Sequence, residues 1–547
     1  MTGTSLEELL RDMGLEHHLK NKLTLSQVLQ IDGETLSDES IQSLKSLPWC
    51  FLRKLMMVNE SFRRMSCSSE QDTKPQSLDS SLNTMNNPQD HSNRVNPLDL
   101  ITAVFLCSDG FLQQEMALKM SMCQFSVPLL LPTCDTQQCT LMLWAMRDIV
   151  KKYKPHSLED PRGFVEESIV LSDLPMVSFV RLGNSSMSKS HILNQVLSNP
   201  QQYQDTFVHK NMECGDTPRR ISNGLVEISW YLPSGNKKND IFSEPLAIAN
   251  LRGDLRDFET QYTFLCRTST AIFVFCDDFE FEQRFLESKP FKTYWILITN
   301  SQSQSFNEDD FRRCVSEGKP SNIIKKHQRM SDAEFNKKLC STLRGIVKGN
   351  IKMGIERMSD LAHELRIHVD EDDYYCKRGK AKADEITGGI SDISSFKEKE
   401  LPLQGTAWKQ LANLEKEQCR IKNAGEKNIE VYKNELADQR QKLREQQKAH
   451  SISNSMSRFI SAMCNSTEEC KYFLKWMRIN LDNLSRTHLP PLWAKYKEQC
   501  RNSSENKELI AKLDREISSC SLGTEHFLRE MGQLFGLLTP RSPHPRD

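Results

Sequence analysis

An eight-residue segment, GNSSMSKS at residues 183–190, carries the residue types with the clearest chemistry in this chain. The pattern GxxxxGK[ST], placed between a strand and a helix, is a phosphate-binding loop. Here Gly183 takes the first glycine position, and Lys189 and Ser190 take the last two. Backbone N–H groups at the start of the following helix would hold the phosphates, Lys189 would neutralise their charge and Ser190 would bind Mg²⁺. If the site is retained, its expected ligands are GTP and Mg²⁺.

The elements on either side of the loop fit this prediction. The apolar run MVSFVRL at residues 176–182 is typical of a buried strand, and HILNQVLS at residues 191–198 continues as a helix. Asn184 is the second residue of the loop, and Ser188 replaces the second glycine of the motif. A Cβ at this position weakens the close approach of the backbone to a phosphate without preventing it.

Two further stretches stand where a GTPase carries its other nucleotide motifs. In NLRG at residues 250–253, Asn250 takes the place of the aspartate of DxxG and Gly253 takes the place of its glycine. The last predicted strand leads into Asn300, and Ser303 stands where the guanine-reading aspartate belongs. Asn250 brings no negative charge to hold Mg²⁺, and Ser303 cannot accept the paired hydrogen bonds that a carboxylate takes from guanine. Metal retention and base selection are therefore both weakened, while the architecture is kept.

The segment from 170 to 303 is rich in short β-forming runs. The runs typical of buried strands are 176–182, 225–232, 245–251, 271–276 and 294–299. The stretches between them leave room for helices, which predicts a mostly parallel sheet flanked by helices. The predicted fold is a GTPase-like α/β domain with a phosphate loop, embedded in a mostly α-helical multidomain chain.

The 547-residue chain divides further by composition. Apolar residues at helical spacing predict a small N-terminal helical module of the sterile-alpha-motif or death-fold kind, or simply a helical cap. A stretch rich in Ser, Asn, Gln and Pro predicts a disordered linker, and strands are expected to end at about residue 320. The predicted segments are the module (1–65), the linker (66–96), the α/β domain with a helical lead-in (97–319), a helical segment (320–400), a long helical domain (401–537) and a disordered tail (538–547).

Bulk properties exclude several classes of function. The formal net charge is -1, and the 17 cysteines include no CxxC pair, so the sequence indicates neither a nucleic-acid partner nor a zinc site. The N-terminus is acidic and amphipathic, unlike a signal peptide, and no apolar run is long enough to cross a bilayer. These features predict a soluble intracellular protein with reduced thiols.

Other polar residues near the loop admit both a chemical and a structural role. His209 could transfer a proton, or it could be a structural or exposed histidine. Arg256, beside Asp254, could reach a phosphate or form a surface ion pair. Asp277 and the acidic residues at 278–282 could hold a cation or form a solvated loop. In each case the structural role is the expected one.

Long stretches of the sequence resemble a known family. GLVEISWYLPSG, PLAIANLRGDLRDF and PLQGTAWKQLANLEKEQCRIK are similar to sequences of the up-regulator of cell proliferation family, which includes the interferon-induced very large GTPases. The same holds for DLITAVFLCSDGFLQQEMALKMSMCQFSVPLLLP, KYFLKWMRINLDNLSR, SLGTEHFLREMGQLF and the opening GLEHHLKNKLTLSQVLQI. The resemblance extends over nearly the whole chain. It implies a cytosolic or nuclear protein linked to interferon responses and growth control.

The resemblance also implies a difference in domain content. In that family an orthodox G domain with an intact phosphate loop follows the segment HFLREMGQL, whereas this chain ends at Asp547, soon after Leu534. We therefore expect the N-terminal half of the family arrangement, with the degenerate loop and without that G domain.

Three functions remain open on the sequence. The first is a non-catalytic GTPase-like scaffold or regulator whose N-terminal module and C-terminal helices bind proteins, including related family members. The second is a slow GTPase that uses Lys189 and Ser190, with Thr206 or Thr217 sensing the γ-phosphate. The third is nucleotide binding without turnover. The paired departures at Asn250 and Ser303 favour the first.

Overall fold

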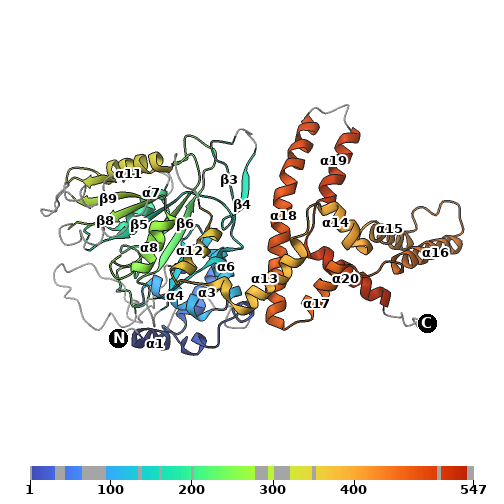
Figure 1. Ribbon diagram of the computed structural model, residues 1–547, viewed down its shortest axis with the longest axis horizontal. Coiled ribbons are helices and arrows are strands. Elements are labelled where there is room, and N and C mark those ends of the chain that lie inside the picture. Colours follow the sequence, from blue (N-terminus) through green and yellow to red (C-terminus); the bar gives the residue numbers. More distant parts are fainter. Residues whose placement is uncertain are drawn as a thin grey trace, which may run out of the picture. The chain divides into compact units, whose positions relative to one another are not determined.

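The computed structural model groups the chain into two compact units, Met1–Asp370 and Glu371–Asp547, called unit 1 and unit 2 below (Figure 1). The described residues are 3–30, 43–63, 94–133, 138–158, 163–183, 185–198, 203–277, 293–300, 321–347, 353–501 and 507–538. Most of the predicted linker, the predicted tail from residue 539, Asn184 and Ser303 lie outside the described residues.

The described part of unit 1 is built on a nine-stranded mixed sheet. In spatial order its strands are β10 (Ser321–Lys326), β9 (Tyr294–Asn300), β8 (Ala271–Phe275), β5 (Met176–Arg181), β7 (Leu246–Leu251), β6 (Val226–Tyr231), β1 (Val127–Pro132), β2 (Cys139–Leu141) and β11 (His368–Val369). Neighbouring strands are parallel from β10 to β7, antiparallel from β7 to β2, and β11 is parallel to β2. The strand β5 leads into the loop from the middle of the sheet. Its carboxyl end therefore faces the crevice in which open α/β sheets bind ligands.

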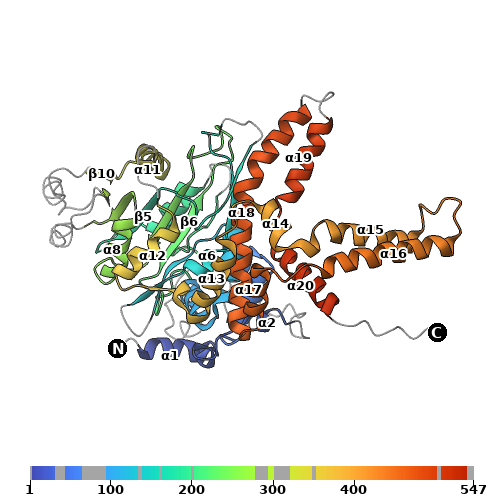
Figure 2. The ribbon, with the colours of Figure 1, turned by 45° about the vertical axis from the view of Figure 1, so that its right-hand side comes forward.

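Helices cover both faces of this sheet, as Figures 1 and 2 show. They are α4 (Pro97–Cys107), α5 (Gly110–Met122), α7 (Lys189–Leu197), α8 (Glu259–Thr268), α11 (Asp332–Val347) and α12 (Met358–Glu364). Successive residues of β5 serve two separate cores: Val177 and Phe179 pack with α7 and α11, whereas Met176 and Val180 pack with the other four helices. This is the period-two alternation of a strand that is buried on both faces.

The N-terminal helices share a hydrophobic core with the sheet. They are α1 (Gly3–Asp12), α2 (Leu25–Val28) and α3 (Leu47–Met56). Leu9 and Phe51 are buried in the same apolar cluster as β1 and β6. The Phe62 ring lies 5.2 Å from that of Phe51 and 5.1 Å from that of Phe125, measured between ring centroids. Helices in this region are confirmed, while the interaction role of the module and the predicted domain boundaries stay predictions.

All five strands expected from the apolar runs are confirmed, as β5, β6, β7, β8 and β9. The expectation that strands end at about residue 320 is wrong, because β10 pairs with β9 and β11 pairs with β2. The strand β10 stands at the end of the described sheet, where Ile324 is buried and Lys325 and Lys326 remain partly exposed. It therefore lacks the continuous apolar run by which buried strands are identified. The sequence also gave no sign of the separate hairpin β3 (Val150–Tyr153) and β4 (Val165–Ser168).

Unit 2 is helical over nearly all its described residues. Its α-helices are α13 (Tyr374–Thr387), α14 (Ile393–Glu400), α15 (Thr406–Arg420), α16 (Ile429–Lys448), α17 (Asn454–Met463), α18 (Thr467–Arg501), α19 (Lys507–Ser519) and α20 (Thr524–Leu538). The charged stretch from 408 to 450 forms two helices that lie side by side, α15 and α16 (Figure 2). The chain turns between them through Ile421 and Gly425, both with positive φ. No helix among the described residues is long and apolar enough to cross a membrane.

Candidate functional site

The predicted loop lies between β5 and α7, and its described residues are Gly183 and those at 185–188. Gly183 has φ +63°, in the left-handed region that favours glycine. Its N–H donates to Asp254 Oδ2 over 2.9 Å. Ser188 is the N-cap of α7 with φ -77°, which any residue adopts. The replacement of the second glycine therefore does not strain the loop, and the amino end of α7 begins at Lys189, as expected.

The Lys189 side chain lies beneath the loop. Its Nζ donates to the Phe179 carbonyl oxygen over 3.2 Å and also to the Leu251 carbonyl oxygen, so it bridges β5 and β7. Burial, together with three neighbouring arginines, holds the pKa of Lys189 well below its ordinary value. Lys189 thus lies at the start of α7, and its ammonium group is hydrogen-bonded to the backbone of two strands.

Ser190 is bound by side chains that come from β6 and from the end of β7. The Ser190 Oγ accepts hydrogen bonds from Arg252 Nη1 at 2.6 Å and Asn250 Nδ2 at 3.3 Å. Glu227 of β6 holds both donors: its Oε2 lies 2.5 Å from Arg252 Nε and 3.2 Å from Asn250 Nδ2. Ser126 Oγ donates to the other carboxylate oxygen over 2.8 Å. We call Glu227, Arg252, Asn250 and Ser190 the buried clamp, because each is at most 7% exposed.

The buried clamp does not fit a divalent cation. A hydroxyl oxygen has two lone pairs, and both lone pairs of Ser190 Oγ already accept a hydrogen bond. The guanidinium of Arg252 lies against the oxygen that Mg²⁺ would need, and like charges repel. Asn250 is neutral, and no group of three or more His, Cys, Asp or Glu able to hold a metal was found in the described residues. The predicted Mg²⁺ role of Ser190 is therefore not supported by the geometry.

A cavity of about 400 Å³, called the loop cavity below, opens between the loop, the end of β7 and the segment before β6. Its cationic lining residues are Arg181, Lys189, Lys210, Arg219 and Arg252, and its only carboxylate among described residues is Asp216. Burial and neighbouring arginines lower the pKa of Arg219 to about 10. Such an excess of cationic over anionic lining residues is typical of a site for anions.

Asn300 and Gly253 both lie at the edge of the loop. Asn300 Nδ2 donates to Ser186 Oγ over 3.2 Å. The Asp277 carboxylate accepts from the N–H groups of Ser186 and Asn300, at 2.6 and 3.3 Å, and so joins β8, β9 and the loop. Gly253 has φ +92°, and a Cβ there would lie 2.5 Å from the Phe258 ring. A second cavity, of about 540 Å³, borders Asn300 on the other side of the loop.

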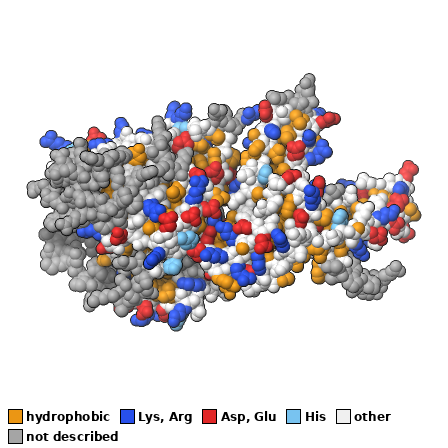
Figure 3. Space-filling view, in the orientation of Figure 1, with side chains coloured by type: hydrophobic (Ala, Val, Ile, Leu, Met, Phe, Trp, Pro, Cys, Tyr) orange, Lys and Arg blue, Asp and Glu red, His pale blue; other side chains and the backbone are white. Residues whose placement is uncertain are grey.

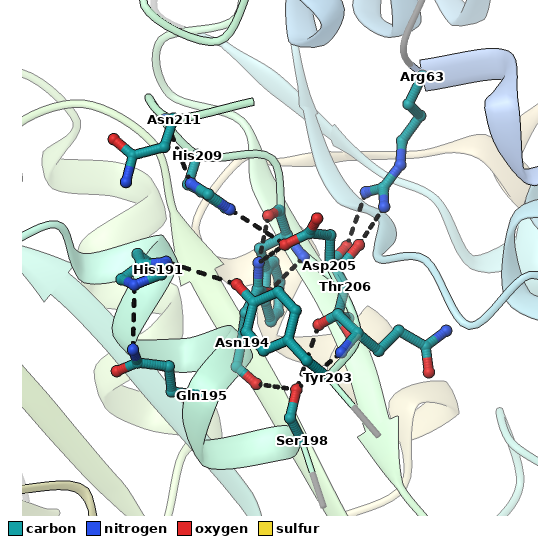
Figure 4. Close-up of polar contacts among 12 residues, drawn as sticks. Arg63, His191, Asn194, Gln195, Ser198, Tyr203, Asp205, Thr206, His209 and Asn211 are labelled. Carbon is teal, nitrogen blue, oxygen red and sulfur yellow. Dashed lines mark hydrogen bonds and ion pairs between the residues drawn. The ribbon is translucent and has the colours of Figure 1, made fainter. Parts of the chain in front are cut away.

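The described part of the segment between α7 and β6, residues 203–225, is held by several hydrogen bonds (Figure 4); in a GTPase this segment senses the γ-phosphate. Arg63 donates to the Thr206 carbonyl oxygen over 3.0 Å and to that of Asp205. Asn194 of α7 exchanges two hydrogen bonds of 2.8 Å with the backbone of Phe207. His209 contacts the Asp205 carboxylate at 3.1 Å, and burial lowers the pKa of His209. This environment fits the structural role expected for His209.

The end of the same segment is fixed by Asp99 of α4. The buried Asp99 carboxylate accepts hydrogen bonds from three consecutive backbone N–H groups, those of residues 220–222, at 2.7, 3.1 and 2.9 Å. Thr217 lines the loop cavity, and its carbonyl oxygen accepts from Asn96 Nδ2 over 2.7 Å. Thr206 is buried outside the cavity lining. Of the two threonines considered as γ-phosphate sensors, only Thr217 lies at the site.

Four of the predicted site residues line the loop cavity, whereas the charged residues around them were not predicted. Ser188, Lys189, Ser190 and Gly253 line the loop cavity. The residues missed were Arg181, Arg219, Arg252 and Glu227. The sequence did contain a sign of Glu227 and Arg252. A glutamate in the apolar run LVEISWYL and an arginine after PLAIANL are both costly to bury unless they are paired. As expected, Arg256 pairs with Asp254, at 2.7 Å.

Comparisons with known proteins agree with this architecture. The sequence model of the up-regulator of cell proliferation-like domain matches residues 95–387, and that of the up-regulator of cell proliferation-like N-terminal domain matches residues 6–83. The model of the URGCP-like GTPase domain matches residues 415–540, whose described part is helical.

Relatives match along most of the chain. Up-regulator of cell proliferation from Bos taurus is 35% identical over 561 residues, which cover 97% of this chain and 60% of that protein. Interferon-induced very large GTPase 1 from Homo sapiens is 28% identical over 98% of this chain and 24% of its own length. Caspase recruitment domain-containing protein 6 from Homo sapiens is 35% identical over 54% of this chain and 30% of its own length. The chain thus spans 60% of the length of the Bos taurus relative.

The mixed sheet with its covering helices, and the match of the URGCP-like GTPase domain model to the later residues 415–540, fit a GTPase-like domain within a multidomain chain. The 293-residue match at 95–387 extends over more than half of the sequence. The chain belongs to the up-regulator of cell proliferation family.

Proposed function

We propose that this chain is a GTPase-like scaffold or regulator that does not hydrolyse GTP and that acts through protein–protein interactions. The buried clamp is the observation that carries the proposal. Phosphoryl transfer relies on a metal ion that bridges the phosphate oxygens. In this chain the Ser190 hydroxyl accepts from Arg252 and Asn250 instead.

The fixed segment before β6 also supports a non-hydrolysing protein. In a GTPase this segment is ordered by the γ-phosphate and released on hydrolysis. Here three backbone N–H groups bind to Asp99, and two backbone carbonyls accept from Arg63. These contacts involve only the chain's own side chains, so they hold the segment whether or not a phosphate is bound.

Protein partners are the second part of the proposal. The relatives include a protein named for its caspase recruitment domain, which is a protein-interaction module, and two named for cell proliferation and interferon induction. We infer that the N-terminal helices and the helices of unit 2 bind proteins, including related family members. Action in the cytoplasm or nucleus, in growth control or interferon responses, belongs to the same proposal.

A single-turnover hydrolysis assay tests the catalytic part. Purified chain in excess over labelled GTP with Mg²⁺ should release phosphate no faster than buffer. The matched variant Lys189→Ala should behave identically, because Lys189 bridges two strands rather than serving a reaction. Phosphate release that requires Mg²⁺ and disappears in Lys189→Ala would overturn the proposal.

The alternative is weak GTP binding or slow hydrolysis at Gly183–Ser190. The strand–loop–helix geometry and the cationic loop cavity favour it. Titration with fluorescent GTP and ATP analogues, with and without Mg²⁺, separates the two. Saturable Mg²⁺-dependent binding that is specific for GTP would favour the alternative, since base reading would then survive the departure at Ser303.

A further inference from the structure

Positively charged side chains predominate among the described residues that line the loop cavity. On the face drawn in Figure 3, Lys and Arg side chains alternate with Asp and Glu side chains. In the cavity, five cationic side chains face one carboxylate, that of Asp216, and Asp216 lies 3.4 Å from Arg94 Nη2. Burial lowers the pKa of His209, another lining residue, and so disfavours its charged form.

One of these cations, Arg252, has a guanidinium N–H group without a hydrogen-bond partner among the described residues. Arg252 is 5% exposed and lines the cavity. Its Nε binds Glu227 and its Nη1 binds Ser190, whereas its Nη2 has no hydrogen-bond partner among the described residues. The buried Nε of Arg181 also has no partner there. A buried guanidinium donor left without an acceptor is costly, and an oxyanion in the cavity would supply that acceptor.

The amino end of α7 adds a third contribution. The helix runs from Lys189 to Leu197, and Ser188, Lys189 and Ser190 at its start line the loop cavity. Such a terminus attracts negative charge through its N–H groups and its dipole. Helix end, arginine donors and cavity therefore converge on one kind of ligand.

We propose that the loop cavity binds a phosphate-type oxyanion, such as the polyphosphate of a nucleotide, without a divalent metal ion, and that Arg252 provides the positive charge that Mg²⁺ would otherwise bring. This inference rests on the proposed function, since it concerns the same loop in a protein that does not hydrolyse GTP. A metal-free polyphosphate carries more negative charge than its Mg²⁺ complex, so it is the better counterpart for a cavity lined by several arginines and lysines. Because Glu227 holds the Arg252 guanidinium in place, this positive charge is fixed at the cavity by the folded protein itself.

Calorimetric titration of the full chain tests the proposal. Pyrophosphate, GTP and ATP are each titrated at constant ionic strength, once in EDTA and once in excess Mg²⁺, because phosphate contacts depend on salt. Saturable binding is expected in EDTA, and excess Mg²⁺ should weaken it at least about tenfold. Equal affinity for the three ligands would show that the cavity recognises only their phosphate groups. Tighter binding of GTP or ATP than of pyrophosphate would identify a nucleotide, and either result supports the inference.

Two variants and one control tie the binding to the cavity. Arg219→Gln removes a lining cation outside the buried clamp and should weaken binding about 10- to 100-fold, the value of one hydrogen bond to a charged group. The double variant Glu227→Gln/Arg252→Gln removes the central cation without leaving its buried counter-charge unpaired. Arg267→Gln is the matched control, because Arg267 pairs with Glu364 outside the cavity. It should bind as the wild type does.

Three results would overturn the inference: binding that requires Mg²⁺, no binding at millimolar ligand by the folded chain, or equal binding by Arg219→Gln and Arg267→Gln. Circular dichroism of each variant shows whether it is folded. Absence of binding overturns this inference alone and leaves a non-hydrolysing regulator. GTP turnover that needs Mg²⁺ and Lys189 overturns the proposed function as well.

Discussion

Replacing Glu227 with glutamine is the most direct perturbation of the buried clamp. Glu227 and Arg252 are 4% and 5% exposed, and their closest atoms lie 2.5 Å apart. Removing one partner of a buried ion pair costs about 3–5 kcal/mol, because the other charge stays buried without compensation. Here the remaining Arg252 would also face Lys189, whose pKa its charge already lowers. We therefore expect Glu227→Gln to destabilise unit 1 by about 3–5 kcal/mol.

A double-mutant cycle measures how much of this cost belongs to the pair. The single variants Glu227→Gln and Arg252→Gln each break the pair, whereas the double variant has two neutral amides that can hydrogen-bond to each other. The double variant should be more stable than the sum of the single costs predicts, by about 2 kcal/mol or more. Urea denaturation gives the free energies of unfolding. Since the chain has two compact units, hydrogen exchange of β6 and β7 peptides assigns the change to unit 1. Additive costs, or a cost of Glu227→Gln below about 1 kcal/mol, would refute the reasoning.

Three further predictions concern other parts of the chain. Gly379→Ala should destabilise unit 2 by about 1–3 kcal/mol in urea denaturation, because its Cβ would lie 2.7 Å from a backbone nitrogen of α18. The control Gly532→Ala, with open space at its Cβ, should stabilise the unit by up to about 1 kcal/mol. Similar effects of the two substitutions would contradict the packing argument. Burial lowers the pKa of His209, so at this residue the folded state binds fewer protons than the unfolded state as pH falls below about 6.5. His209 should therefore contribute a loss of stability of at most about 1.4 kcal/mol per pH unit there. Thermal melts of His209→Gln should show a shallower loss than the wild type, and identical slopes would count against this prediction. Asp99→Ala leaves three backbone donors unpaired and should lower the free energy of unfolding by about 3 kcal/mol or more. Hydrogen exchange at residues 220–222 should become faster. Unchanged hydrogen exchange there would show that Asp99 does not hold the segment.

The parts of the fold that could be predicted are those with one dominant local signal. The strand β5 and the helix α7 follow from an apolar run, a glycine-led loop and a helical pattern, and Gly183 indeed has positive φ. The strands β10 and β11 could not be predicted, because β10 is partly exposed and β11 is two residues long, so neither has an apolar run of its own. Their strand identity depends on β9 and β2, far away in sequence.

The site divides in the same way. The types and spacing of Lys189 and Ser190 predict where they lie, because both belong to one helix turn beside the loop. What binds to Ser190 could not be predicted. Its donors Asn250 and Arg252 come from the end of β7 and the residue after it, and Glu227 reaches them through the register of β6 on β7. From the sequence, Asn250 implies only the loss of the negative charge that an aspartate would bring to Mg²⁺. In the structure the same amide donates to both Ser190 and Glu227, which an aspartate carboxylate could not do.

Arg63 has a practical consequence for anyone who cuts this chain into fragments. It ends the short 3₁₀ helix Glu60–Arg63, lies over the Phe125 ring at 3.3 Å and holds the Thr206 carbonyl oxygen. A fragment beginning at residue 94 would look natural on composition, yet it would expose Phe125 and leave that carbonyl without this donor. Such a fragment would be prone to aggregate, and its nucleotide titrations would report on a damaged cavity wall. Expression of unit 1 should therefore start at the first helix, with the intervening stretch kept or replaced by a flexible linker of similar length.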